Sequence, residues 1–258
     1  MPVQPPRHLE FTDDGIRLDA VLEMPEDFTG SCPLVIVLHG FTGHKEERHI
    51  LGVSEAIRDC GCATLRADLY GHGLSGGTFQ DHTLFRWIQN IFLLVDRARE
   101  MPFVSSIWLC GHSQGGLSVL LAGALKCDQI MGIIALSPAC MIPEGARSGN
   151  LLGIHFDPEH VPDTLPAWGD RTLGGNYVRV AQSIRTEDVL PNITVPVLVV
   201  HGDADDAVPA EVGAESAALC PRGEFVSIPG DTHCYDHHLP SVQAAVRDWL
   251  KAHVLGHT

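Results

Sequence analysis

The pentapeptide at positions 111–115, Gly-His-Ser-Gln-Gly, constrains the fold of this chain more than any other feature. It follows an apolar run over 106–110 that predicts a strand, and it opens a stretch over 116–122 that predicts a helix. In a turn this sharp, only glycines at the flanking positions let the strand and the helix approach each other. The serine then takes a strained conformation that holds its Oγ at the helix N-terminus, where negative charge is favoured. The pattern therefore predicts Ser113 as a nucleophile.

A nucleophilic serine needs partners, and glycine-rich turns also occur for packing alone. The partners are a base that takes the serine proton, a carboxylate that orients the base, and two donors for the oxyanion. In hydrolases with this turn the chain order is serine, then acid, then histidine. An acid loop and a histidine loop downstream would thus distinguish a catalytic turn from a packing turn.

Loops of this kind follow three further predicted strands. The β-branched run over 195–200 predicts a buried parallel strand and ends in a loop that holds three aspartates. The run over 224–228 predicts the last strand, and His233 follows it in a short loop. Upstream, the run over 33–38 ends in His-Gly-Phe at 39–41, where a second oxyanion donor is expected. All parts of a serine hydrolase occur in the required order.

Composition fits one large α/β unit and excludes several partners. The chain has 258 residues, of which 45% are hydrophobic and 19% charged, so it is long enough to bury a core and too apolar to be disordered. Its net charge is 17 − 32 = −15, which makes nucleic acid and anionic membranes poor partners. No apolar segment approaches the roughly 18 residues that would span a bilayer.

The cysteines and the N-terminus bear on location. The eight cysteines include several in or beside apolar runs, and no C-x-x-C pair occurs. Such residues are expected to be reduced, buried thiols. Positions 1–8 lack the apolar core of a secretory signal. We therefore expect a cytoplasmic protein.

The coarse pattern alternates strand and helix. Predicted strands lie at 16–22 (antiparallel), 33–38, 63–67, 106–110, 132–136, 195–200 and 224–228, and predicted helices lie near 53–58, 84–99, 116–122, 210–219 and 241–253. Alternation of this kind predicts an α/β fold with a mostly parallel sheet and helices on both faces. We expect one domain over 1–258.

One segment interrupts the alternation. Between 139 and 188 no buried-strand run occurs, and Gly, Pro, Asp and aromatic residues are interleaved. Roughly fifty structureless residues would be unusual inside a compact domain, so the segment is predicted to be an inserted cap over the site. Caps of this kind select the substrate and exclude water; the alternative is a surface excursion without a role.

Long, uncommon strings along the chain carry a resemblance to a known family. They are HGFTGH at 39–44 with ERH at 47–49, YGHGLS at 70–75, DHTLF at 81–85, GHSQG at 111–115, GNYVRVAQ at 175–182, the loop at 202–209, and GDTHCYDHH at 230–238. By these strings the whole chain resembles the bacterial feruloyl (cinnamoyl) esterases of the α/β-hydrolase superfamily. The resemblance implies an α/β-hydrolase fold, hydrolysis of hydroxycinnamate esters attached to sugars, a cap that shapes the acyl pocket, and frequently a homodimer.

The same resemblance implies a role for each catalytic residue. Ser113 attacks the ester carbonyl, and His233 takes the serine proton and returns it to the leaving alcohol. The backbone N–H groups of Phe41 and Gln114 hold the oxyanion. Asp205 has the spacing that the superfamily uses within the 202–209 loop, so it is predicted as the acid.

Some assignments stay open at this point. Asp203 and Asp206 compete with Asp205 as the acid, although loop capping or solvation would also explain them. Trp168 in the cap is either a core aromatic or a wall of the acyl pocket, and the resemblance favours the pocket. His39 and His112 flank tight turns and are expected to hydrogen-bond to backbone rather than react.

A metal or other cofactor is not expected. A dense group could in principle bind a cation, and it consists of Asp231, His233, Asp236, His237 and His238. A cation on His233 would disable that residue as a base, so the group is interpreted without a metal.

Other functions remain as alternatives. A monoacylglycerol lipase, a lysophospholipase or a thioesterase would use the same triad with a longer apolar channel. A hydrolase-fold binding protein without turnover is disfavoured because serine, aspartate and histidine are all present, and a C–C bond hydrolase is a weaker option. Haloalkane dehalogenases and epoxide hydrolases need aspartate where Ser113 stands.

Overall fold

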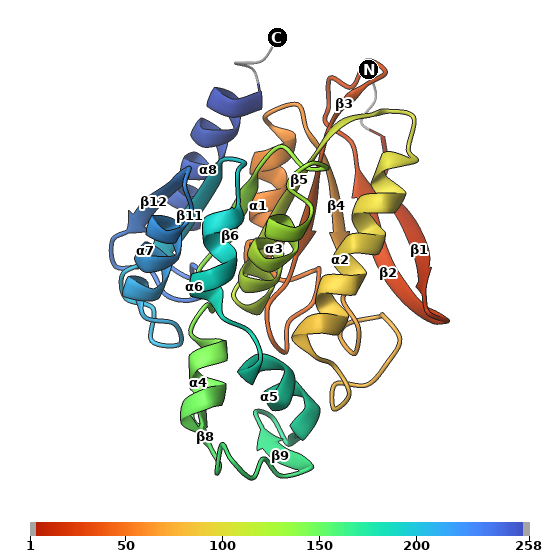
Figure 1. Cartoon of the computed structure of the whole chain (residues 1–258). Helices are drawn as coiled ribbons and strands as arrows, with labels where there is room; N and C mark the ends of the chain where they lie inside the picture. The colour runs from red at the N-terminus through yellow and green to blue at the C-terminus, as the bar shows by residue number, and fades with distance from the viewer. Residues whose placement is uncertain (1–3, 255–258) are drawn as a thin grey trace.

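Eight strands form the central sheet of the computed structural model, which describes residues 4–254 (Figure 1). They are β1 (Arg7–Asp13), β2 (Ile16–Glu23), β3 (Cys32–Leu38), β4 (Ala63–Ala67), β5 (Val104–His112), β6 (Ile133–Leu136), β11 (Val197–Gly202) and β12 (Gly223–Ile228). Their order across the sheet is β1-β2-β4-β3-β5-β6-β11-β12. β1 and β2 pair antiparallel, β2 also pairs antiparallel with β4, and every other pairing in this sheet is parallel. The predicted α/β-hydrolase fold is confirmed.

Helices cover both faces of the sheet because its central strands are apolar on both sides. In β3, Leu34 and Ile36 pack into one core together with side chains of the helices α2 (Leu84–Arg99) and α3 (Gln114–Leu125). The alternate residue Val35 packs into a second core with α1 (Arg48–Arg58) and α8 (Leu239–Val254). Successive side chains of a strand point to opposite faces, so a continuous apolar run requires a layer of helices on each side. α7 (Ala210–Leu219) joins the first core through Ala217.

Short elements fill the segment between β6 and β11. They are α4 (Ile142–Ser148), β7 (Asn150–Leu151), β8 (Ile154–His155), β9 (Thr164–Ala167), β10 (Arg171–Gly174), α5 (Gly175–Gln182), α6 (Thr186–Val189) and the 3₁₀ turn η1 (Leu190–Asn192). β7 pairs with β8 and β9 with β10, each pair antiparallel. Figure 1 shows α4, α5, β8 and β9 grouped beyond the lower end of the sheet. This segment, the insert below, therefore extends from the end of the sheet where β5 passes into α3.

None of the helices within residues 4–254 combines the length and the apolarity needed to cross a bilayer.

Candidate active site

Ser113 lies in the turn between β5 and α3 that the sequence predicted. Its backbone has φ 56° and ψ −120°, a conformation that an L-residue rarely adopts. The flanking glycines explain how the turn closes. A Cβ at Gly111 would collide with the Gly115 carbonyl oxygen, and a Cβ at Gly115 would collide with the His39 carbonyl oxygen. The surrounding backbone thus holds a strained serine at the start of a buried helix.

The serine faces a cavity of about 630 Å³ at the end of the sheet. Side chains from the core and from the insert line it, including Phe41, Leu152, Trp168, Val208 and His233. Ser113 itself is 8% exposed. A cavity of this size with an apolar wall and a nucleophile suits a small organic substrate.

Asp205 and His233 form a close pair. Asp205 Oδ2 accepts a hydrogen bond from His233 Nδ1 over 2.7 Å, and its Oδ1 accepts from the backbone N–H groups of Ala207 and Val208 at 2.9 and 2.8 Å. His201 Nε2 lies 3.1 Å from the same Oδ2. Burial opposes ionisation of the Asp205 carboxyl, but the hydrogen bonds from the two imidazoles outweigh it and hold its pKa well below the usual range. The pair therefore has a fixed carboxylate that orients one imidazole.

The other two aspartates of this loop have different surroundings. Asp206 is exposed, and Asp203 Oδ1 accepts the backbone N–H of Gly230 over 2.6 Å. Asp205 is the one whose carboxyl contacts His233, and its side chain has no exposed surface. Asp205 is thus the carboxylate that contacts the His233 ring, whereas Asp203 bonds to the backbone of the neighbouring loop.

Asp231 has a positioning role that the sequence analysis missed. It is fully buried, and its carboxylate accepts backbone N–H groups of Thr232, His237 and His238 at 2.9, 3.1 and 3.2 Å. These bonds fix the loop that carries His233. One acidic residue of the string at 230–238 is thus structural, because the buried Asp231 carboxylate hydrogen-bonds to the backbone of its own loop.

Ser113 and His233 share the cavity without a direct bond. Within residues 4–254 the structure has no hydrogen bond between Ser113 Oγ and the His233 ring, although both residues line the same space. In substrate-free sites such bonds are often long and shorten only in the Michaelis complex.

The two expected oxyanion donors come from different elements next to the serine. Gln114 is the first residue of α3, where backbone N–H groups have no preceding helical carbonyl. Phe41 lies in the loop after β3. This loop packs closely on the turn around Ser113, which we call the nucleophile elbow: a Cβ at Gly40 would lie 2.9 Å from the Ser113 Cβ. His39 braces this loop: Nδ1 donates to the Gly40 carbonyl over 2.8 Å, and Nε2 accepts from the backbone N–H of Leu69 over 3.0 Å.

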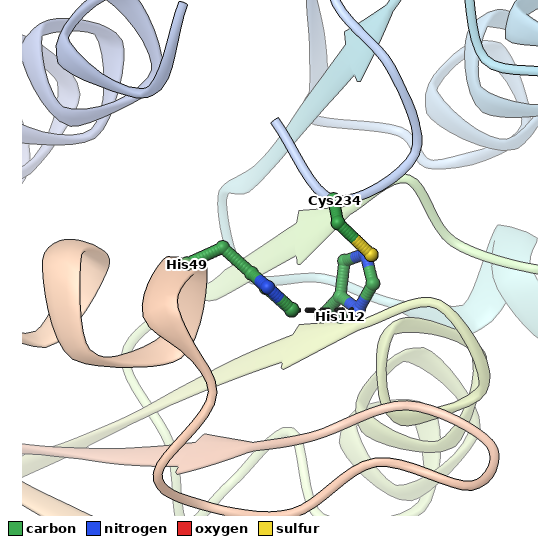
Figure 2. A group of neighbouring side chains, drawn as sticks. All are labelled: His49, His112 and Cys234. Carbon is green, nitrogen blue, oxygen red and sulfur yellow. Dashed lines mark hydrogen bonds between the residues drawn. The ribbon is translucent and has the colours of Figure 1, made fainter. Parts of the chain in front are cut away.

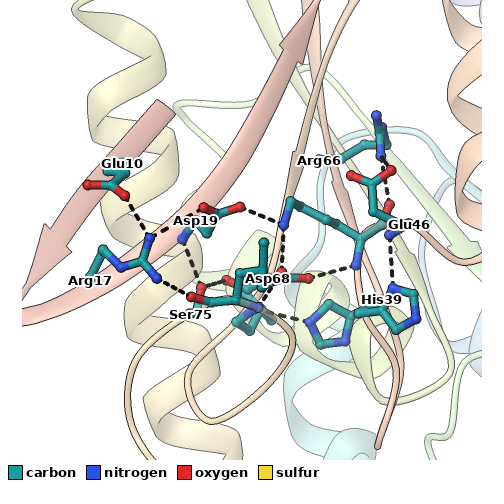
Figure 3. Close-up of polar contacts among 12 residues, drawn as sticks. Glu10, Arg17, Asp19, His39, Glu46, Arg66, Asp68 and Ser75 are labelled. Carbon is teal, nitrogen blue, oxygen red and sulfur yellow. Dashed lines mark hydrogen bonds and ion pairs between the residues drawn. The ribbon is translucent and has the colours of Figure 1, made fainter. Parts of the chain in front are cut away.

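A buried ion-pair network holds the loop after β3, which carries Phe41 (Figure 3). Lys45, 2% exposed, reaches Asp68 Oδ2 at 2.6 Å and Asp19 Oδ1 at 2.5 Å. Asp68 also accepts the backbone N–H groups of Lys45 and Leu74, at 2.7 and 2.8 Å. One carboxylate therefore joins the loop after β3 to the loop after β4. No motif in the sequence indicated this network, because its members are far apart in the chain.

The insert contacts Phe41 through aromatic side chains. The Phe41 ring packs edge-on against Trp168 and Tyr177, with centroids 5.5 and 5.8 Å apart. Trp168 is 46% exposed and lines the cavity, so it is not a core aromatic. Its position agrees with the pocket-wall alternative.

Comparisons with known proteins place the chain in a family. Residues 30–166 match the family described as serine aminopeptidase, S33. Among curated proteins, the mitochondrial palmitoyl-protein thioesterase ABHD10 of Mus musculus is 24% identical over 70% of this chain, and the chain covers 61% of its length. Among solved structures, mouse alpha/beta hydrolase domain-containing protein 10 superposes with a TM-score of 0.75 at 16% identity, over 95% of this chain and 98% of that one.

The chain belongs to this family, and its fold and site define a serine esterase of the α/β-hydrolase class. A much stronger likeness is to Est1E from Butyrivibrio proteoclasticus, whose structure has ferulic acid bound. The two are 54% identical, with a TM-score of 0.94 over 96% of this chain and 99% of Est1E.

Proposed function

We propose that this protein hydrolyses esters of hydroxycinnamic acids, of which feruloyl esters attached to sugars are the natural class. The observation that carries the proposal is the 54% identity to a structure that binds ferulic acid. The cavity supports it, because aromatic side chains of Phe41 and Trp168 line the space in front of Ser113. Offset or edge-on packing on such rings stabilises an aromatic acyl group.

The proposed reaction proceeds through an acyl-enzyme. Ser113 Oγ attacks the ester carbonyl while His233 Nε2 takes its proton, and the oxyanion is held by the N–H groups of Gln114 and Phe41. His233 then protonates the leaving alcohol, and a water molecule repeats the cycle on the acyl group. The 2.7 Å bond from His233 Nδ1 to Asp205 sets the tautomer that leaves Nε2 free to act as base.

The insert is proposed to be the cap that shapes the acyl pocket, with approximate bounds 139–188. Leu152 and Trp168 from the insert line the cavity opposite residues of the acid and histidine loops. A cap in this place would select the acyl group and shield the acyl-enzyme from water.

A panel of substrates tests the proposal. Methyl ferulate, p-coumarate, caffeate and sinapate would be compared with acyl esters of graded length and with palmitoyl thioesters. We expect kcat/KM to be highest for a hydroxycinnamate. A preference for palmitoyl thioesters would instead favour the thioesterase alternative, which the curated relatives suggest by name.

A cytoplasmic location and a homodimer are also proposed. All eight cysteines are free thiols in the structure, as expected for a reducing compartment. Light scattering of the purified chain tests the dimer, and fractionation of the source cells tests the location.

A further inference from the structure

Three side chains that the proposed mechanism does not use meet beside the triad. His49 comes from the first turn of α1, His112 from the end of β5, and Cys234 from the loop after β12 (Figure 2). Figure 2 shows the side chains of His49 and Cys234 pointing toward the His112 ring, with a dashed line between the two imidazoles. Two of them are sequence neighbours of catalytic residues, since His112 precedes Ser113 and Cys234 follows His233. The cluster thus connects the elbow to the histidine loop.

The spacing of these atoms suits a small cation with tetrahedral coordination. His49 Nε2 and His112 Nδ1 lie 3.1 Å apart, and the ligand atoms of all three residues lie within 4.8 Å of one another. Zn²⁺ binds nitrogen at about 2.0–2.1 Å and sulfur at about 2.3 Å, which places two nitrogens about 3.3 Å apart in a tetrahedral site. The two imidazoles are therefore close to the separation that a shared zinc ion requires.

The hydrogen bonds of His112 place a lone pair on Nδ1, where it accepts the N–H of His49 Nε2 over 3.1 Å. His112 Nε2 donates to the carbonyl of His233 over 2.8 Å, so the lone pair of this neutral ring is on Nδ1, toward His49. Metal-binding histidines typically donate their second N–H to a carbonyl in this way.

Glu47 offers a fourth ligand, an oxygen, beside His49, although it lies outside the group of three whose ligand atoms are all within 4.8 Å of one another. Its Oε2 is buried without a hydrogen-bond partner among the described residues, and it lies 3.9 Å from His49 Nε2. A buried, unpaired carboxylate oxygen is costly unless a cation or donor satisfies it. Two imidazoles, a thiol and a carboxyl group form the mixed N, S and O set that zinc binds.

We propose that His49, His112 and Cys234, with Glu47 as the fourth ligand, form a binding site for Zn²⁺, and that its occupancy slows the adjacent triad. On binding, the Cys234 thiol releases its proton to solvent, and the His49 proton moves from Nε2 to Nδ1, so both atoms can donate a lone pair to the ion. No redox change is involved.

The link to turnover follows from where the ligands sit. Coordination draws the sulfur and the nitrogens, up to 4.8 Å apart in the structure, toward a common centre. His112 and Cys234 are each one residue from a reacting side chain, so this contraction displaces Ser113 relative to His233. A misplacement of about 1 Å can cost on the order of 100-fold in rate. We expect zinc to lower kcat by about tenfold or more.

Metal binding is measured separately from activity. The full chain is stripped with a chelator and titrated with Zn²⁺, and Co²⁺ serves as a spectroscopic probe because a thiolate ligand gives it a charge-transfer band. We expect one ion per chain, a thiolate band, and slowed ester hydrolysis that recovers on chelation. Cys234→Ser abolishes the band and the inhibition. Cys127→Ser, at another partly buried free cysteine, changes neither.

Glu47→Gln provides a second variant that keeps all three other ligands. It weakens zinc affinity by about tenfold or more while the thiolate band remains. The proposal is overturned if the folded wild-type chain binds no zinc, or if zinc binding is unchanged by Cys234→Ser, which would place the ion elsewhere. Full occupancy with unchanged turnover would overturn the coupling to the triad.

Discussion

Tyr177 and Gln114 join the insert to the nucleophile elbow: the Tyr177 hydroxyl donates to Gln114 Oε1 over 2.7 Å. Tyr177 belongs to α5 and is fully buried, and Gln114 is the first residue of α3. Because the backbone N–H of Gln114 is a proposed oxyanion donor, this bond couples the position of the insert to the site where negative charge develops.

The first prediction concerns this bond. Tyr177→Phe removes the hydroxyl and leaves the buried Gln114 amide oxygen without its donor, which costs about 1–3 kcal/mol of unfolding free energy. We also expect kcat to fall about tenfold as the oxyanion donor loses its support. Urea unfolding and steady-state kinetics measure the two effects. Tyr70→Phe is the control, because Tyr70 takes no part in the bond to Gln114. Equal effects in both variants would contradict the coupling.

The second prediction concerns the nucleophile. Ser113→Ala should fold normally and lose ester hydrolysis by about four orders of magnitude or more, because only binding and the oxyanion donors remain. Initial rates and circular dichroism measure activity and folding. Ser241→Ala, at an exposed position of α8, should keep full activity. Near-normal turnover by Ser113→Ala would refute the serine mechanism.

The third prediction separates the aspartates of the acid loop. Asp205→Asn keeps the shape of the side chain but no longer fixes the His233 tautomer, so kcat should fall about 10⁴-fold. Asp206→Asn changes an exposed neighbour in the same loop and should alter kcat less than about twofold. Comparable losses in the two variants would mean that the loop, rather than one carboxylate, was disturbed.

Patterns within single elements made much of the fold predictable. The strand at 63–67 and the helices at 84–99 and 210–219 have the predicted bounds, because each has a continuous apolar run or a helical period. β1 was missed because its side chains are exposed or half-buried, as is typical of an edge strand. The hairpins of the insert are two to four residues per strand, too short to show a period.

Contacts between distant parts of the chain were not predictable in the same way. The turn around Ser113 is encoded within five residues, so its position was evident. The bonds of Lys45 to Asp68 and of Tyr177 to Gln114 join segments 23 and 63 residues apart. Which side chains meet there depends on how whole elements pack against one another. The spacing of residues in a single sequence does not reveal that packing.

The fourth prediction concerns pH and stability. Burial, the largest cause, lowers the pKa of His82 to about 4, although its bond to the Phe79 carbonyl opposes the shift. In the unfolded chain a histidine titrates near about 6.5, so between these values the unfolded state binds a proton that the folded state does not. The stabilisation from this group is therefore complete above about pH 6.5 and is lost as pH falls toward about 4.

Urea unfolding at pH 7.5 and 5.0 measures this effect. We expect the wild-type chain to lose more unfolding free energy on acidification than His82→Gln does, by about 2 kcal/mol. His155→Gln replaces an exposed histidine and should behave like the wild type. The same pH dependence in all three chains would rule out His82 as a source of acid sensitivity.

The last prediction concerns Trp168 and distinguishes a feruloyl esterase from a general one. Trp168 lines the cavity and packs edge-on against Phe41, with ring centroids 5.5 Å apart. A cinnamoyl group in this space would pack on the indole, a contact worth about 0.5–1.5 kcal/mol beyond burial alone. With the lost burial added, Trp168→Ala should lower kcat/KM for feruloyl esters about tenfold or more. Acetyl esters do not reach the ring and should change much less, while Trp168→Phe should recover part of the feruloyl activity. Ser113, Asp205 and His233 are unaltered in these variants, so an equal loss for acetyl and feruloyl esters would mean that the insert had collapsed, and Trp168 would have no role in acyl recognition.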